Sequence, residues 1–256
     1  MRRLRLPFLL LAILPGALLW ELVGRLQVSF IPPLSDVIRA GLDVWSSERF
    51  LESLGGSVTA LVTGLALAAV IGIVLGVLMG RFDPVAWAFD PYINVLMSSP
   101  KAALIPIIVL FFGFGREAVV LTVFLYAFFP VVVNTAAGVR QTPRNFIEMA
   151  RSFGASEWAI ARRVTVPAAA PLVFGGLRFA AARSIKGVII GEQLISLVGL
   201  GALVQRYGVQ FQFEQLYSIV LIVAFAGLGL SGAFRWLESA LLPWAPGARV
   251  TRGVSE

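Results

Sequence analysis

Four charged side chains interrupt the fifth long apolar run of this sequence. They are Arg178, Arg183, Lys186 and Glu192. At 100° per residue, with Arg178 at 0°, Lys186 falls near 80° and Glu192 near 320°, so these three share one broad helical face. Charges inside a membrane-spanning helix are costly and indicate a function. Arg178, Lys186 and Glu192 are therefore candidates to line a pathway in which the cations lower the barrier for an anion. The alternative is that Arg178 snorkels to the cytoplasmic interface and Lys186 pairs with a carboxylate from a neighbouring helix.

The sequence offers few residues for catalysis, metal binding or nucleotide binding. The chain has no His and no Cys, which removes the commonest general base and every thiolate metal site. Its only lysines, Lys101 and Lys186, are followed by Ala and Gly, so neither completes a phosphate-binding loop. The run Gly113-Phe-Gly-Arg-Glu-Ala118 mimics a dinucleotide fingerprint, but no βαβ unit surrounds it, and we interpret it as a turn between helices. We expect no enzyme activity, no cofactor and no metal.

The composition indicates a membrane protein. Of 256 residues, 58% are hydrophobic and 14% charged, whereas soluble domains carry about 45–50% and about 25%. At about 20 apolar residues per span, the length allows five to seven transmembrane helices. We therefore predict an all-α, polytopic, single-domain protein over residues 1–256, with its core at about 53–244. The net charge of +7 comes from basic residues between apolar runs, which favours a role in membrane topology over nucleic-acid binding.

The apolar runs predict six spans. Ser35 is expected to cap a short interfacial helix after the first span, and Gly72 and Gly76 to allow close helix packing in the second. The predicted spans are Leu6–Val23, Ser57–Met79, one span with a flanking helix within 85–114, Glu117–Val139, Pro171–Leu200 and Leu216–Trp244.

The distribution of Lys and Arg predicts the orientation. Thirteen of the 21 basic residues, Lys101 among them, fall on the side of the N-terminus, five fall on the other side, and three lie inside the fifth run. Because cytoplasmic loops carry the excess of Lys and Arg, we expect both termini and the 140–171 loop to be cytoplasmic.

That loop carries a helix–glycine–helix pattern. Thr142 is a candidate cap, and Phe146, Met149, Ala150 and Phe153 follow the spacing of one apolar helix face. Gly154 occupies the position of a left-handed C-terminal cap, a second helix covers about 156–163, and Pro167 is expected to end the unit. On the pattern alone, the apolar face either packs on the protein's own spans or docks a cytoplasmic subunit.

The motif Glu148-Met-Ala-(3)-Gly154-(9)-Val164-Thr-Val-Pro167 resembles the Glu-Ala-Ala…Gly…Ile-x-Leu-Pro signature of the permease subunits of ABC importers. Three conservative departures stand at residues 149, 164 and 166. The resemblance extends over roughly residues 30–244 and is to the nitrate/sulfonate/taurine branch. It is also carried by Ile31–Asp36, Ser99–Pro106, Phe112–Gly115, Phe129–Thr135, Gly176–Arg178 and Gly199–Gly201.

The resemblance implies a function and a set of partners. It implies a permease in the bacterial inner membrane that imports a small anionic solute, with a second permease copy, two separate ATPase subunits and an extracytoplasmic binding protein. The residues at or near the ATPase would be Glu148, Met149, Ala150, Phe153, Gly154 and Pro167. An ion-coupled secondary transporter is the alternative, but such transporters show inverted repeats, and no convincing internal repeat is present.

Overall fold

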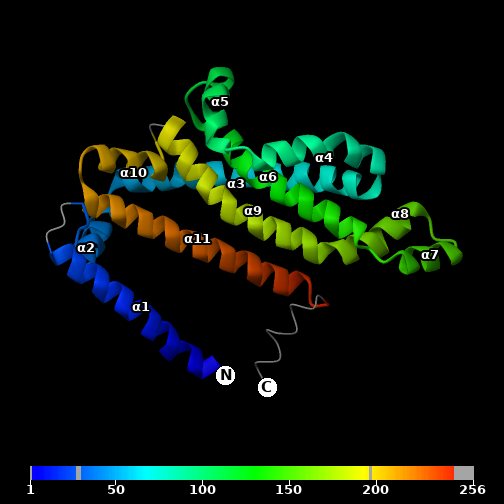
Figure 1. The fold of residues 1–256 in the computed structure, drawn as a ribbon, viewed down its shortest axis with the longest axis horizontal. Coiled ribbons are helices and arrows are strands. Elements are labelled where there is room, and N and C mark those ends of the chain that lie inside the picture. Colours follow the sequence, from blue (N-terminus) through cyan, green and yellow to red (C-terminus); the bar gives the residue numbers. More distant parts are fainter. Residues whose placement is uncertain (1, 27–29, 196–197, 245–256) are drawn as a thin grey trace.

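Every regular element that the structure describes is a helix (Figure 1). The computed structural model describes the backbone of residues 2–26, 30–195 and 198–244, with side chains from residue 14 onward in those ranges. In chain order the helices are α1 (Arg2–Arg25), α2 (Leu34–Trp45), α3 (Glu48–Arg81), α4 (Asp83–Ser98), the 3-10 helix η1 (Lys101–Leu104), α5 (Ile105–Phe112), α6 (Arg116–Arg140), α7 (Arg144–Ser152), α8 (Glu157–Ile160), the π-helical segment η2 (Ala161–Thr165), α9 (Val166–Ile195), α10 (Leu200–Val209) and α11 (Phe213–Leu241).

The long apolar helices lie where the sequence predicts spans. Four helical runs are long and apolar enough to cross a membrane: α3, α6, the continuous run Glu157–Ile195 and α11. A fifth is possible if α4 and the segment Lys101–Phe112, which bend by 101°, form one broken span. The 24-residue α1 covers the first predicted span. The all-α, multi-pass fold is therefore confirmed.

The helix α6 is the centre of the bundle. It packs along α3 on one side and α9 on the other. The contact with α3 is close because small residues of α3 face α6; a Cβ added to Gly76 would lie 2.6 Å from the Thr135 Cβ and 2.8 Å from the Val132 carbonyl oxygen. Gly72 likewise faces Val131. The predicted role of Gly72 and Gly76 is confirmed.

Both helix caps predicted from hydroxyl residues were wrong. The helix α2 starts after Pro33, and Ser35 lies inside its first turn, where its backbone N–H and hydroxyl donate to Glu21 at 3.0 Å each. The carboxylate of the preceding helix thus takes the capping role. The helix α7 starts after Pro143, and the hydroxyl of Thr142 is buried without a hydrogen-bond partner.

Two predicted boundaries of the fifth span were also wrong. Pro167 does not end a unit, because the chain stays helical from Glu157 to Ile195 and Pro167 is the second residue of α9. The π-helical turn of η2 precedes Pro167. Its backbone hydrogen bonds span five residues instead of four, which changes the bonding pattern at the point where the proline lacks an N–H donor. The helix ends at Ile195 rather than at Leu200, which instead starts α10 after Gly199 at φ +135°.

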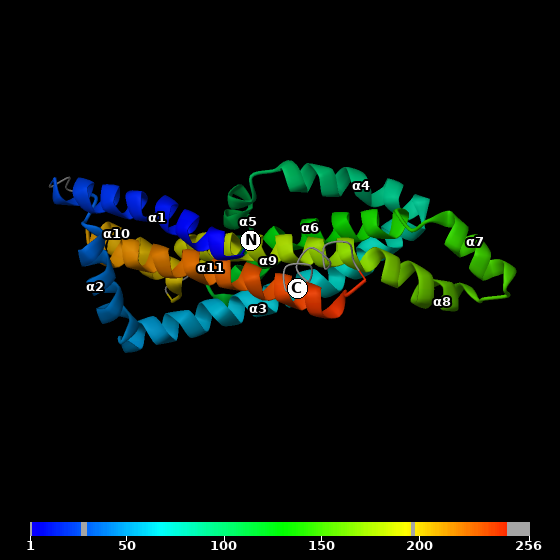
Figure 2. The same ribbon diagram turned by 90° about the horizontal axis from the view of Figure 1, so that it is seen from below.

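The ends of the bundle differ. The elements α2 and α10 gather at one end, and α7 and α8 extend beyond the other (Figures 1 and 2). The fold therefore carries a helical hairpin at one end of its long helices.

Candidate coupling surface and intramembrane charges

The turn between α7 and α8 has the geometry predicted for Gly154. The residue adopts φ +75°, which glycine reaches without steric cost. Its N–H donates to the Arg151 carbonyl at 2.9 Å, and the Ala155 N–H donates to the Ala150 carbonyl at 3.0 Å. These two bonds form a Schellman motif, which satisfies the last carbonyls of α7 and reverses the chain sharply. The helix–glycine–helix prediction is confirmed.

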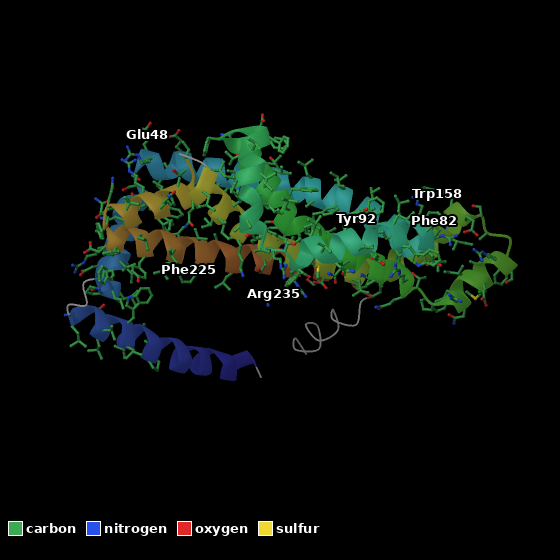
Figure 3. The ribbon with its side chains drawn as sticks, turned by 45° about the horizontal axis from the view of Figure 1, so that its top comes forward. Glu48, Phe82, Tyr92, Trp158, Phe225 and Arg235 are labelled. Atoms are coloured by element: carbon green, nitrogen blue, oxygen red, sulfur yellow. The ribbon has the colours of Figure 1, made fainter. Side chains whose placement is uncertain are left out.

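The apolar face of α7 does not pack on the spans. No residue of α7 is buried. Phe153 is 84% exposed and Met149 53% exposed, Phe146 and Glu148 are also exposed, and Ala150 is half-buried. Trp158 of α8 and Phe82 at the end of α3 add two more exposed rings near this end (Figure 3). The structure therefore gives no support to the interpretation in which this face packs on the protein's own spans, and it leaves an exposed apolar patch at the end of the bundle.

Ion pairs connect the hairpin to the bundle. Glu157 of α8 accepts hydrogen bonds from Arg151 of α7 at 3.0 Å and from Arg81 at the end of α3 at 2.6 Å. The hydrogen bond from Arg151, with the charges of both arginines, holds the pKa of Glu157 below its ordinary value. One carboxylate therefore links α7, α8 and α3. Pro167, at the start of α9, accepts a hydrogen bond through its carbonyl from the Trp244 indole at 3.4 Å.

The charged residues of α9 lie in different surroundings. Arg178 donates to Glu238 of α11 at 3.1 Å, so it is held by an ion pair between neighbouring helices. Lys186 is exposed and takes part in no ion pair among the described residues. The structure does not gather Arg178, Lys186 and Glu192 around one shared contact.

Glu192 is buried and holds the start of α10. Its side chain is 2% exposed, and its oxygens lie 2.7 and 2.8 Å from the Ser57 hydroxyl of α3. The Gly201 N–H donates to the carboxylate at 2.9 Å, and the Leu200 N–H donates to the Ser57 hydroxyl at 2.9 Å. A carboxylate at this position is also stabilised by the positive end of the α10 helix dipole.

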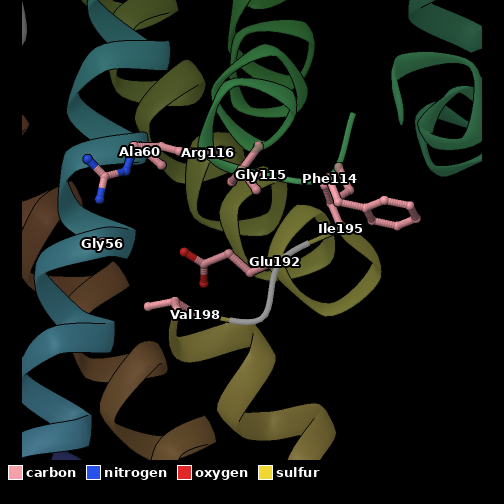
Figure 4. A pocket seen from close by; sticks show the side chains of 9 residues that line it. Gly56, Ala60, Phe114, Gly115, Arg116, Glu192, Ile195 and Val198 are labelled. Carbon is pink, nitrogen blue, oxygen red and sulfur yellow. The ribbon is translucent and has the colours of Figure 1, made fainter. Parts of the chain in front are cut away.

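The network between α3, α9 and α10 was not predicted from the sequence. The one residue in the sequence that pointed to this network was Gly199. Only glycine fits there, because a Cβ at this position would overlap the Glu192 carboxyl group. The carboxyl group points toward α3 and borders a cavity of about 320 Å³ (Figure 4). The cavity is lined by Gly56, Ala60, Phe114, Gly115, Arg116, Val119, Glu192, Ile195 and Val198.

The comparison with protein families decides the identity of the chain. Residues 68–244 match the family described as the inner membrane component of binding-protein-dependent transport systems. The chain belongs to this family. It is therefore a transmembrane permease component of the ABC importer class, as the coupling motif predicted.

Curated relatives cover most of the chain and transport different solutes. The formylaminopyrimidine transport permease of Halalkalibacterium halodurans is 31% identical over 88% of this chain and 91% of its own length. The taurine transport permease of Escherichia coli is 28% identical, with 88% and 85% covered. The bicarbonate transport permease of Synechococcus elongatus is 30% identical, with 90% and 81% covered. These relatives lend no support to the ion-coupled alternative.

Solved structures have the same fold. The MetNI methionine ABC transporter in an inward-facing conformation matches 76% of this chain and 98% of its own, with a TM-score of 0.67 at 17% identity. A bacterial alginate ABC transporter, solved with a periplasmic protein bound to alginate pentasaccharide, matches 94% and 97%, with a TM-score of 0.66 at 14% identity. At these identities the likeness concerns the fold.

Proposed function

We propose that this permease forms the translocation pathway of an ATP-driven importer. Two copies of the chain enclose the pathway, two separate ATPase subunits dock on the α7–α8 hairpin, and an extracytoplasmic binding protein delivers a small anionic solute. The observation that carries the proposal is the exposed apolar face of α7, which ends in the Gly154 turn at the position of the family's coupling motif. Glu148, Met149, Ala150, Phe153 and Gly154 are the proposed contact residues, and Pro167 lies at the base of the hairpin.

The hairpin is built to pass a movement into the bundle. The helix is continuous from Glu157 to Ile195, so a displacement of α8 moves α9 with it. Glu157 also connects α7 to the end of α3 through Arg151 and Arg81. A rigid-body rocking of the ATPase subunits would therefore reach two helices that pack on α6.

Co-purification tests the proposal. The tagged chain is isolated in mild detergent, and a P-loop ATPase is expected in equal amount by mass spectrometry. Glu148→Arg and Gly154→Trp should remove the ATPase, because the first reverses a charge on the exposed face and the second forces a bulky residue into φ +75°. Arg235→Gln on α11 is the matched control and should keep the ATPase. A stable chain that never retains an ATPase would refute the proposal.

A further inference from the structure

A sharp break in the chain positions Lys101 against α6, where it is half-buried. The helix α4 ends at Ser98, Pro100 follows, and the next segment turns away by 101°. Irregular backbone at membrane depth is tolerated where it is buried in protein or lines a water-filled cavity. The break lays Lys101 on α6, where its Nζ lies 5.3 Å from the centre of the Phe129 ring and 6.0 Å from that of Tyr126. The count of basic residues had assigned Lys101 to the cytoplasmic side.

A second and a third cation lie close by on α9. Arg183 stands one helical turn before Gly187 on α9, and its guanidinium group lies 4.5 Å from the centre of the Phe179 ring. Lys186 follows three residues later, on the adjacent turn and exposed. Tyr126, which lies under Lys101, packs directly against Gly187. The rings of α6 thus connect the cation of the helix break to the cations of α9.

These cations have no acidic partner in the parts of the chain that the structure describes. The six ion pairs found there include neither Lys101 nor Arg183 nor Lys186. Three acids of the neighbouring helices are engaged elsewhere: Glu238 pairs with Arg178, Glu192 accepts from Ser57 and Gly201, and Asp90 lies 3.8 Å from Arg140. Lys101 donates only to the Met97 carbonyl, at 3.1 Å.

The cations of α9 lie far from both ends of the helix. Arg183 and Lys186 follow Val166, the first residue of α9, by 17 and 20 residues, and precede its last residue, Ile195, by 12 and 9. At 1.5 Å per residue, Arg183 is roughly 18 Å from the nearer end. Unpaired cations at such depth are stable where they face water or an anion rather than lipid.

We infer that Lys101, Arg183 and Lys186 form an anion-binding site within the translocation pathway. The ligand is a small anion with a carboxylate or sulfonate head group, and the rings of Tyr126 and Phe179 pack against its remainder. The inference rests on the proposed function and names the three residues of the pathway that would hold its anionic solute. It replaces two of the pathway residues predicted from the sequence, since Arg178 is held by Glu238 and Glu192 holds α10.

The two lysines of the chain provide a direct test, because both belong to the site. The full chain, in membrane vesicles of each orientation, is treated with a water-soluble acetylating ester, and acetylation of Lys101 and Lys186 is measured by peptide mass spectrometry. Methanesulfonate is the anion probe and dimethyl sulfone its neutral analogue of similar shape, with ionic strength fixed by sodium chloride, which carries neither a carboxylate nor a sulfonate. We expect both lysines to react and methanesulfonate alone to slow the reaction, by about tenfold at ten times its dissociation constant.

Two variants separate a site from general charge screening. Arg183→Gln should abolish the protection and leave the lysines reactive, whereas Arg235→Gln, an exposed cation on α11, should retain it. Lysines that stay unreactive, react without protection, or lose protection equally in both variants would overturn the inference. Failure of the proposed function is distinguishable, because it appears as the absence of a co-purifying ATPase in an assay that does not depend on these lysines.

Discussion

At the scale of single residues, Ser57 and Glu192 show how a charge in a membrane helix can serve architecture. A helix N-terminus leaves backbone N–H groups without partners, and in an apolar bundle each would be costly. The Leu200 N–H uses the Ser57 hydroxyl and the Gly201 N–H uses the Glu192 carboxylate, so α3 and α9 together cap α10. The hydroxyl in turn donates to the carboxylate.

Ser57→Ala should therefore destabilise the protein. The substitution leaves the Leu200 N–H without an acceptor and the buried Glu192 carboxylate with one donor fewer, which costs about 1–3 kcal/mol for an unsatisfied buried group. The melting midpoint in detergent should fall. Thr59→Ala is the control on the same helix, since Thr59 is exposed and bonds only to the Gly55 carbonyl of its own helix. Equal midpoints for the two variants would show that the cap contributes nothing.

Residue-level prediction succeeded where one residue carries the signal. Gly154 was found because a glycine after an amphipathic stretch fits a left-handed cap. The caps predicted at Ser35 and Thr142 were wrong, and for α2 the reason is that the group that satisfies the helix start comes from another helix, as Glu21 shows. The partners of Arg178 and Glu192 lie 60 and 135 residues away in sequence, so no local spacing reports them.

At the scale of elements, the packing of α3 on α6 depends on small residues on the face of α3 that meets α6. Residues 68, 72 and 76 of α3 are Ala, Gly and Gly at four-residue spacing, and each is buried. Small residues allow two helix backbones to approach closely. In lipid there is no hydrophobic driving force between helices, so the dispersion contacts made by this close approach hold the two helices together. Spans and small-residue stripes were predictable for this reason, because both are periodic in the sequence. The helix break at Lys101 was predictable in position from its prolines, but the direction of the bend was not.

Gly76→Ala should separate α3 from α6. The new Cβ would lie 2.6 Å from the Thr135 Cβ and 2.8 Å from a backbone oxygen that cannot move away alone, which costs about 1–3 kcal/mol for overpacking. Gly55→Ala on the same helix has no neighbour within 4 Å and should gain up to about 1 kcal/mol of helix propensity. Melting midpoints by size-exclusion chromatography after heating would rank the two variants on either side of the wild type. An unchanged midpoint for Gly76→Ala would contradict the close approach.

At the scale of the whole molecule, we predict that the two ends of the bundle face different compartments. The end that carries α7 and α8 bears the proposed ATPase surface and the larger share of arginines, while α2 and α10 occupy the opposite end (Figure 1). Because cytoplasmic segments carry the excess of Lys and Arg, we expect the hairpin and both termini to be cytoplasmic. This orientation is what an importer coupled to a cytoplasmic ATPase requires, so both proposals depend on it.

Single-cysteine variants test the orientation. Because the chain contains no Cys, no other residue of this chain reacts with a thiol reagent. Ser152→Cys in α7 and Gln210→Cys after α10 are both exposed and lie at opposite ends of the bundle. A membrane-impermeant maleimide added to intact cells should label residue 210 and leave residue 152 unlabelled, and inside-out vesicles should give the reverse. Because both positions are solvent-exposed, detergent should make them equally reactive, which controls for thiol reactivity. If residue 152 is labelled from outside the cell, the hairpin faces away from ATP and cannot be the coupling surface of an importer.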